Sequence, residues 1–210
     1  FPDKKVGYYY PPSLVDKDEE DKKKPLALLI LIYQYTYSKL AKLIIKMAHQ
    51  NKMIVCHIDP QYLDSYQLKK IIEKEKEIWI SSYSTSLPWF WGCFHVGSEE
   101  IYHLTAQWYS QGIKSPKMAF HVNPSAIQSF PDSGKRASFE TLIWVDKNFY
   151  QSKNAWDLYY QIGNQPGKYR GKNYHRKLLN TLSVEYPNKE KYQYITSQTM
   201  KHILNILIYQ

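Results

Sequence analysis

Cys93 is the residue of this sequence that is best placed for covalent chemistry. It ends the run "WFWGC", residues 89–93, and a helix-like segment begins five residues later at Ser98. A thiolate is the reactive form of cysteine, and a helix N-terminus lowers the pKa of a nearby thiol. His121, followed by Asp146 or Asn148, would complete the order of groups used by cysteine proteases. Cys93 is therefore a candidate reactive thiol, and a cysteine-dependent enzyme is the third of three functional alternatives.

Other chemistry has little support in the sequence. Cys56 is the only other cysteine, so one disulfide or two free thiols both fit, and the spacing matches no zinc site. The chain has no CxxC, GxGxxG, HExxH or phosphate-binding P-loop motif. We expect no catalytic residue, no metal, no cofactor and, on balance, no enzymatic activity.

A basic cluster carries the second alternative. The chain has 28 Lys and Arg against 19 Asp and Glu, a net charge of +9, which favours polyanionic partners. The cluster spans residues 168–177, "KYRGKNYHRK". Basic side chains could contact phosphates there while tyrosines stack on unpaired bases. The residues of this nucleic-acid hypothesis are Lys168, Tyr169, Arg170, Lys172, Arg176 and Lys177.

Alternating segments must position these groups. β-Branched and aromatic residues predict strands at 52–58, 77–84, 117–122, 139–146 and 191–195. Helical patterns lie at 62–75, 98–112, 155–163 and 174–182. The most apolar stretch, residues 25–38, is too short to span a bilayer and reads as the start of a buried helix, so we expect no integral membrane protein. The alternation predicts an α/β fold with a mixed central sheet flanked by helices.

The order of these segments resembles the thioredoxin fold over residues 77–150. A strand leads into "WFWGC", a helix follows, and "ETLIWVDKN" at 140–148 resembles the later strand of that family. In the resemblance, Trp89 takes the place of the tryptophan in Trp-Cys-x-x-Cys, and Cys93 that of the second cysteine. Phe90 stands where the attacking cysteine would be, and Glu140 replaces the cis-proline. The resemblance implies a thioredoxin-like, redox-inactive domain, because disulfide exchange needs both thiols.

Residues 1–24 are expected to form an extended N-terminal arm ahead of an α/β domain at 25–210. The arm combines "GYYYPP" with a run of mixed charge and has no apolar periodicity. Such a segment buries too little to fold alone, so it is either disordered or bound to a partner. Its aromatic residues are Tyr8, Tyr9 and Tyr10.

The leading hypothesis is a non-catalytic accessory or assembly subunit that acts through protein–protein contacts in a larger complex. The protein-binding residues would be Trp89, Phe90 and Trp91, with Trp91 at the exposed crest of a loop, together with the three tyrosines of the arm. In outline the chain is similar to pilus-assembly proteins of F-type conjugation systems. The compartment stays open: a periplasmic or organellar location after removal of a targeting segment fits a chain that begins at Phe1.

Overall fold

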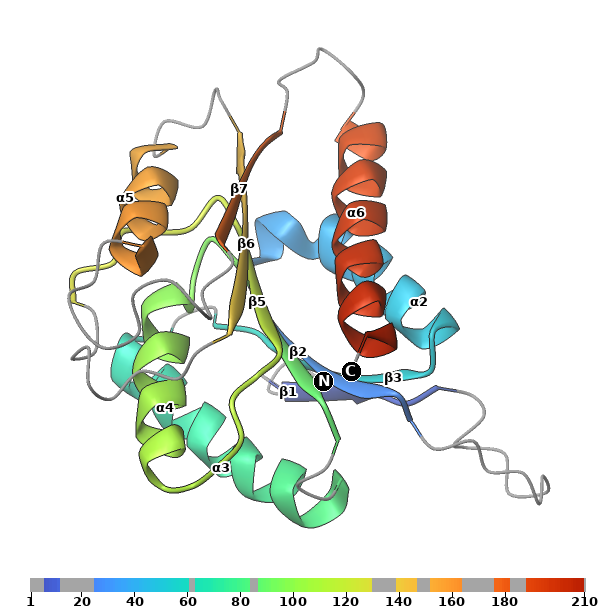
Figure 1. Cartoon of the computed structure of the whole chain (residues 1–210), viewed down its shortest axis with the longest axis vertical. Coiled ribbons are helices and arrows are strands. Elements are labelled where there is room, and N and C mark those ends of the chain that lie inside the picture. Colours follow the sequence, from blue (N-terminus) through green and yellow to red (C-terminus); the bar gives the residue numbers. More distant parts are fainter. Residues whose placement is uncertain are drawn as a thin grey trace.

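The computed structural model of the chain describes residues 6–11, 25–60, 63–83, 87–129, 139–146, 152–163, 176–181 and 188–209. Within these ranges, seven strands form one sheet in the order β1-β3-β2-β4-β5-β6-β7 (Figure 1). The strands are β1 (Val6–Tyr9), β2 (Ala27–Tyr33), β3 (Met53–Ile58), β4 (Trp89–Phe94), β5 (Met118–Val122), β6 (Glu140–Asp146) and β7 (Arg176–Thr181). β1 is antiparallel to β3, and the other neighbours are parallel.

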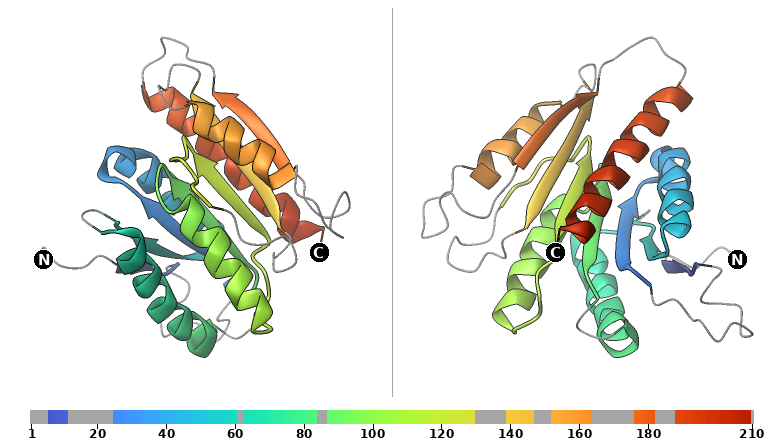
Figure 2. Two further views of the ribbon diagram at one scale, coloured as in Figure 1. Left: turned by 90° about the vertical axis from the view of Figure 1, so that its left-hand side faces the viewer. Right: turned by 45° about the vertical axis from the view of Figure 1, so that its right-hand side comes forward.

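Helices cover both faces of the sheet. They are α2 (Ser38–Gln50), α3 (Ser65–Tyr83), α4 (Ser98–Ser110), α5 (Ser152–Gly163) and α6 (Asn188–Ile208), and a short 3-10 turn, η1 (Tyr35–Tyr37), precedes α2. The helices α3, α4 and α5 lie on one face, and α2 and α6 lie on the other (Figures 1 and 2). The protein is thus a three-layer α/β structure.

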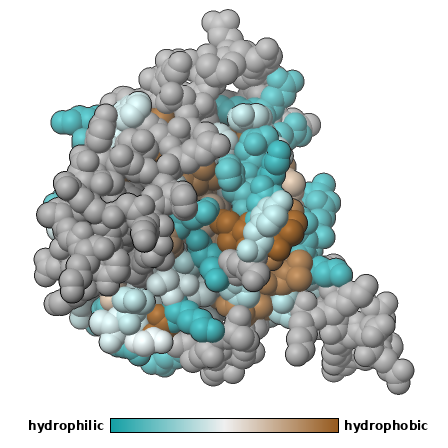
Figure 3. Space-filling view, in the orientation of Figure 1, coloured by the Kyte–Doolittle hydropathy of each residue, from teal (hydrophilic) through white to brown (hydrophobic). Residues whose placement is uncertain are grey.

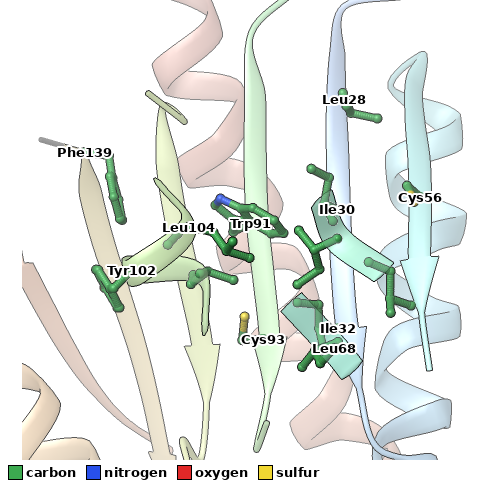
Figure 4. Packing of buried hydrophobic residues seen from close by; sticks show 14 of the residues in the cluster. Leu28, Ile30, Ile32, Cys56, Leu68, Trp91, Cys93, Tyr102, Leu104 and Phe139 are labelled. Carbon is green, nitrogen blue, oxygen red and sulfur yellow. The ribbon is translucent and has the colours of Figure 1, made fainter. Parts of the chain in front are cut away.

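Apolar residues run along the central strands without a break because both faces of the sheet are buried. In β2, Leu28, Ile30 and Ile32 pack toward α3 and α4, while Ala27, Leu29 and Leu31 pack toward α2. Figure 4 shows Trp91 and Cys93 of β4 pointing to the α4 face, near Leu104. The core therefore continues from one layer to the next through the sheet.

The surface over α2 and α6 is partly apolar. Figure 3 shows hydrophobic side chains exposed around the lower end of α6, where Ile208 and Tyr209 are 73% and 88% exposed. Even so, none of the helices in the described ranges is both long enough and apolar enough to cross a membrane.

The structure confirms the α/β fold with a mixed sheet flanked by helices, and it confirms the strands predicted near 52–58, 117–122 and 139–146. Four other segments were predicted wrongly. Residues 27–33 form β2 rather than a helix, and β7 lies where a helix was predicted at 174–182. The strands predicted at 77–84 and 191–195 fall largely or wholly within helices α3 and α6.

The predicted arm is only partly described. Residues 6–9 form β1 and pair with β3, with Val6 opposite Ile58 and Tyr9 opposite Val55. Residues 1–5 and 12–24 lie outside the described ranges. The division of the chain into an arm and an α/β domain stays a prediction.

Candidate functional site

His95 lies in the tight turn between β4 and α4. Its backbone φ is +70°, in the left-handed region that residues other than glycine seldom adopt. The N–H of His95 donates to Val122 O at 2.9 Å, and the N–H of Ser125 donates to His95 O at 2.6 Å. Gly97, with φ +85°, then leads into α4. The turn places His95 at the carboxyl end of a central strand, where open α/β sheets bind ligands.

Two neighbours hold the His95 ring. Its Nδ1 lies 3.1 Å from the carbonyl oxygen of Asn123, and the Tyr37 ring stacks on it with centroids 6.5 Å apart. Asn123 also has a left-handed backbone, with φ +46°, and its Nδ2 donates to the Tyr37 hydroxyl at 3.3 Å. A carbonyl oxygen can only accept, so we assign the proton of the neutral ring to Nδ1. Nε2 then carries the lone pair.

A pocket of about 600 Å³ opens beside this turn. One wall contains Val96 and Gly97 of the turn, and another contains residues 34–36, which follow β2. His95 itself does not line the pocket, although both its neighbour Val96 and its hydrogen-bond partner Ser125 do. The pocket therefore lies beside the turn that carries His95, at the carboxyl ends of β2, β4 and β5.

The pocket is acidic although the protein is basic. Asp64, Glu99 and Glu100 line it, and no Lys, Arg or His is found among its described lining residues. Asp64 accepts a hydrogen bond from Gln67 N–H at 2.7 Å, as a helix-capping residue does. Glu99 accepts one from Gln128 N–H at 2.8 Å and so fixes a second wall. The lining favours neutral or cationic ligands over anions.

A buried polar chain lies beneath the turn. Ser98 Oγ is 2.9 Å from His121 Nδ1, Tyr102 OH is 3.2 Å from His121 Nε2, and Tyr102 OH is 3.1 Å from Thr141 Oγ1. All four side chains are buried, and burial lowers the pKa of His121 to about 3. A neutral, enclosed imidazole cannot meet a substrate. These hydrogen bonds instead connect the start of α4 to β5 and β6.

Comparisons with solved structures find this architecture in several hydrolases. No protein-family model matches the sequence, and no curated protein matches it. Est1E from Butyrivibrio proteoclasticus aligns over 97% of this chain and 94% of its own, with a TM-score of 0.62 and 8% identity. An S-formylglutathione hydrolase from Agrobacterium tumefaciens aligns over 94% and 88%, with a TM-score of 0.61 and 12% identity.

An esterase from the bacterial hormone-sensitive lipase family gives a TM-score of 0.61 and 10% identity, over 97% of this chain and 79% of its own. At such identities the likeness shows the fold, which is the α/β-hydrolase fold. The predicted resemblances to thioredoxin-like proteins and to pilus-assembly proteins are therefore wrong. So is the predicted role as a non-catalytic, redox-inactive accessory or assembly subunit, because the structures that share this fold are esterases and lipases.

The turn around His95 corresponds in position to the nucleophile elbow of α/β hydrolases. In α/β hydrolases the nucleophilic serine lies in a strained strand-to-helix turn with the pattern Gly-x-Ser-x-Gly. Here the five positions are Cys93, Phe94, His95, Val96 and Gly97, so histidine occupies the position of the serine. Without a serine at this position, no serine triad forms at this turn. The triad order of the fold also requires a histidine after the acid.

The sequence carries few candidates for the rest of such a triad. Asp146 ends β6 at the same edge of the sheet as the elbow. Only His175 and His202 follow Asp146 in the sequence. His175 lies outside the described residues, and His202 belongs to α6, away from the strand ends.

The predicted aromatic loop is a strand. Phe90 and Trp91 are fully buried in β4, and Trp89 is half-buried, with its Nε1 donating to Lys114 O at 3.2 Å. The exposed crest expected at Trp91 is therefore absent, because β4 lies between β2 and β5 in the interior of the sheet. A strand rather than a turn at 89–94 also removes the basis for matching Cys93 to the second thioredoxin cysteine.

The remaining predicted residues are scattered. Tyr8, Tyr9 and Tyr10 lie in or next to β1, with Tyr9 and Tyr10 exposed, and their role in protein binding stays a prediction. Arg176 and Lys177 begin β7 and pair with Thr141 and Leu142. Residues 168–175, including Lys168, Tyr169, Arg170 and Lys172, and also residue Asn148, lie outside the described ranges.

The cysteine hypothesis fails on burial. Cys93 lies directly opposite His121 in the β4–β5 register, but the ring nitrogens of His121 are taken by Ser98 and Tyr102. Cys93 is fully buried, and burial raises the pKa of its thiol well above the usual value. Cys56 lies on β3, with β2 between it and Cys93, so the two cannot form a disulfide and both are free.

We expect both thiols to be inert in the folded protein. Burial raises the pKa of Cys56 to about 12 and also raises that of Cys93, so neither forms a thiolate near neutral pH. Titration with dithionitrobenzoate should detect essentially no thiol under native conditions and both thiols in denaturant. Rapid native reaction of one thiol would contradict the buried position of that cysteine.

Sequence reasoning missed His95, Asn123 and Tyr37. The signal for His95 was present in residues 93–97, which read small-x-His-x-Gly between an apolar strand and a helix. The interpretation of the neighbouring Cys93 as the reactive group hid it. Nothing local indicates that Tyr37 and Asn123, 86 residues apart, contact each other.

Proposed function

We propose that the protein is an ester hydrolase in which the imidazole of His95 attacks the acyl carbon in place of a serine hydroxyl. The observation that carries the proposal is the position of His95 in the strained elbow, with Nδ1 directed at the carbonyl of Asn123. Histidine is among the side chains that form covalent catalytic intermediates. The shared fold with esterases supports the same class of substrate.

In the first step the lone pair of Nε2 attacks the ester carbonyl carbon, and the carbonyl π electrons move to its oxygen. The amide of Val96, the residue after His95, corresponds to one oxyanion donor of α/β hydrolases, and the loop after β2 supplies the other in that fold. Among the described residues, the Val96 amide donates to no protein acceptor. Residues 34–36 of the loop after β2 line the same pocket as Val96.

The tetrahedral intermediate then collapses. The ester C–O bond breaks, the alkoxide takes a proton from water, and the acyl group remains on Nε2 as an acyl-imidazolium. Its Nδ1–H still donates to Asn123 O, as in the resting enzyme. A second attack, by hydroxide or water on the acyl carbon, releases the carboxylic acid and restores the neutral ring. The sum is ester plus water giving acid plus alcohol.

The test is hydrolysis of a neutral ester by the purified chain, because the three carboxylates of the pocket disfavour anionic substrates. We expect His95→Asn to lower the rate by about 100-fold or more, an effect typical of groups that act in the chemical step. Asparagine tolerates the left-handed backbone and lacks the imidazole. Rates with p-nitrophenyl butyrate and with an unactivated alkyl ester measure this loss.

A second histidine variant controls for the slow ester cleavage that any exposed imidazole causes. His202→Gln, on α6, should retain the full rate. An equal loss in both variants would contradict the proposal. So would a wild-type rate no higher than that of free imidazole at the same concentration. Saturable binding of the ester without hydrolysis would reassign the pocket to ligand binding.

A further inference from the structure

β1 is held to the edge of the sheet by side chains on both of its faces. It has four residues and, among the described strands, pairs with β3 alone. On one face, the Tyr8 hydroxyl donates to the carboxylate of Glu75 and accepts from Trp79 Nε1 at 2.9 Å. Glu75 is buried in α3, so these bonds join the strand to the core of the protein.

The opposite face of β1 lies against histidines. Gly7 covers the His57 ring so closely that a Cβ at Gly7 would lie 2.4 Å from His57 Cε1. The Tyr9 ring contacts His57 and His49, with centroids 5.5 Å and 5.8 Å apart. Tyr33 of β2 lies 5.8 Å from the His57 ring. Only a glycine at position 7 allows the strand to seat on this imidazole.

Two nitrogens under β1 are buried without a partner. His57 Nδ1 and His49 Nε2 have no hydrogen-bond partner among the described residues. A neutral ring tolerates one unpartnered nitrogen as a lone pair. A protonated ring has two N–H donors, and in this half-buried ring an N–H left unpaired against β1 disfavours the charged form.

We propose that β1 is a pH-dependent latch, seated on the sheet when His57 is neutral and released when His57 is protonated. Release exposes Nδ1 to water and so satisfies the second donor. It also uncovers the edge of β3 from Val55 to Ile58, whose backbone groups pair with β1 in the closed form. An uncovered edge of this kind is a template for pairing with another strand.

The groups around His57 shift its pKa in opposite directions. Burial lowers the pKa of His57, while the backbone of Gly7 and the carboxylate of Asp59 favour the charged ring less strongly. Tyr9, Tyr33 and, across Tyr9, His49 complete the surroundings. A pKa that is lower in the closed form means that the open form binds the proton more tightly. Closure is therefore favoured at neutral pH and weakens as the pH falls.

Hydrogen exchange of the β1 amides tests the latch without reference to ester hydrolysis. Between about pH 7.5 and about pH 5.5, protection of residues 6–9, corrected for intrinsic rates, should fall, because the open form binds the proton more tightly. Protection of β5, which lies inside the sheet and follows global unfolding, should change with pH equally in the wild type and in the His57 variants. His57→Phe keeps an aromatic ring without a titrating nitrogen and should abolish the pH dependence.

Gly7→Ala supplies the opposite control, because its methyl group collides with His57 and should leave β1 unprotected at both pH values. His57→Gln serves as a second non-titrating variant if the Phe ring does not fit. Equal protection of β1 in the wild type at both pH values would overturn the latch. The same fall in both His57 variants would overturn the role of His57.

Discussion

Replacing Trp91 with alanine should lower the free energy of unfolding by about 3 to 5 kcal/mol, the usual cost of truncating a buried tryptophan. Trp91 is fully buried, packs edge-on against Trp79 and Trp89, and stacks on Trp108 with centroids 6.0 Å apart. The substitution leaves a cavity between β4 and α4 that rigid neighbouring rings cannot fill. Urea unfolding followed by circular dichroism measures the loss.

Two further variants make the result specific. Trp89→Ala should cost less, because Trp89 is only half-buried. Trp91→Phe should also cost less than Trp91→Ala, because a ring remains and the buried Trp91 Nε1 has no hydrogen-bond partner to lose among the described residues. A loss below about 1 kcal/mol for Trp91→Ala would contradict the burial of this side chain.

The sequence predicted that Trp91 is exposed, whereas the structure makes Trp91 more sensitive to truncation than Trp89. "WFWGC" contains the aromatic residues that both a core strand and a docking loop use. Only the register of β4 between β2 and β5 shows that Phe90 and Trp91 are covered on both sides of the sheet. That register depends on contacts between residues far apart in the sequence, which a local pattern does not contain.

Elements with a clear period or clear ends were predictable. β3, β5 and β6 have β-branched and aromatic runs, and α4 has two acids in its first turn. β2 was not predictable as a strand, since an unbroken apolar run has no period that separates a buried strand from a buried helix. Residues 77–83 have strand-like composition, but they continue the helix whose Leu68, Ile72 and Trp79 face the core.

The site was harder to predict than the fold because its signal lies in the backbone. A positive φ at His95 and at Asn123 is what aims the ring and the carbonyl at each other, and the residue types alone do not reveal it. The fold supplies that conformation through the turn that every strand-to-helix elbow of this kind requires. Once the elbow is recognised, His95 becomes the residue to test.

Acid should destabilise the protein through His121. This imidazole is fully buried, and burial lowers its pKa to about 3, whereas histidine in an unfolded chain titrates near 6.5. Between these two pH values the unfolded chain binds a proton that the folded protein does not. Stability therefore falls as the pH drops from about 6.5 toward about 3, by roughly 3 to 5 kcal/mol from this group.

A matched variant isolates this contribution from that of the carboxylates and of His57, which titrate in both proteins. His121→Gln keeps a donor and an acceptor for Ser98 and Tyr102 but cannot be protonated. Urea unfolding at several pH values should show the wild type losing stability more steeply below about pH 6.5, by up to one proton's worth of slope, about 1.4 kcal/mol per pH unit. Parallel curves for the two proteins would mean that His121 is hydrated or charged in the folded state. In that case the hydrogen bonds that link Ser98, His121, Tyr102 and Thr141 would lack the shielding from water that their geometry indicates.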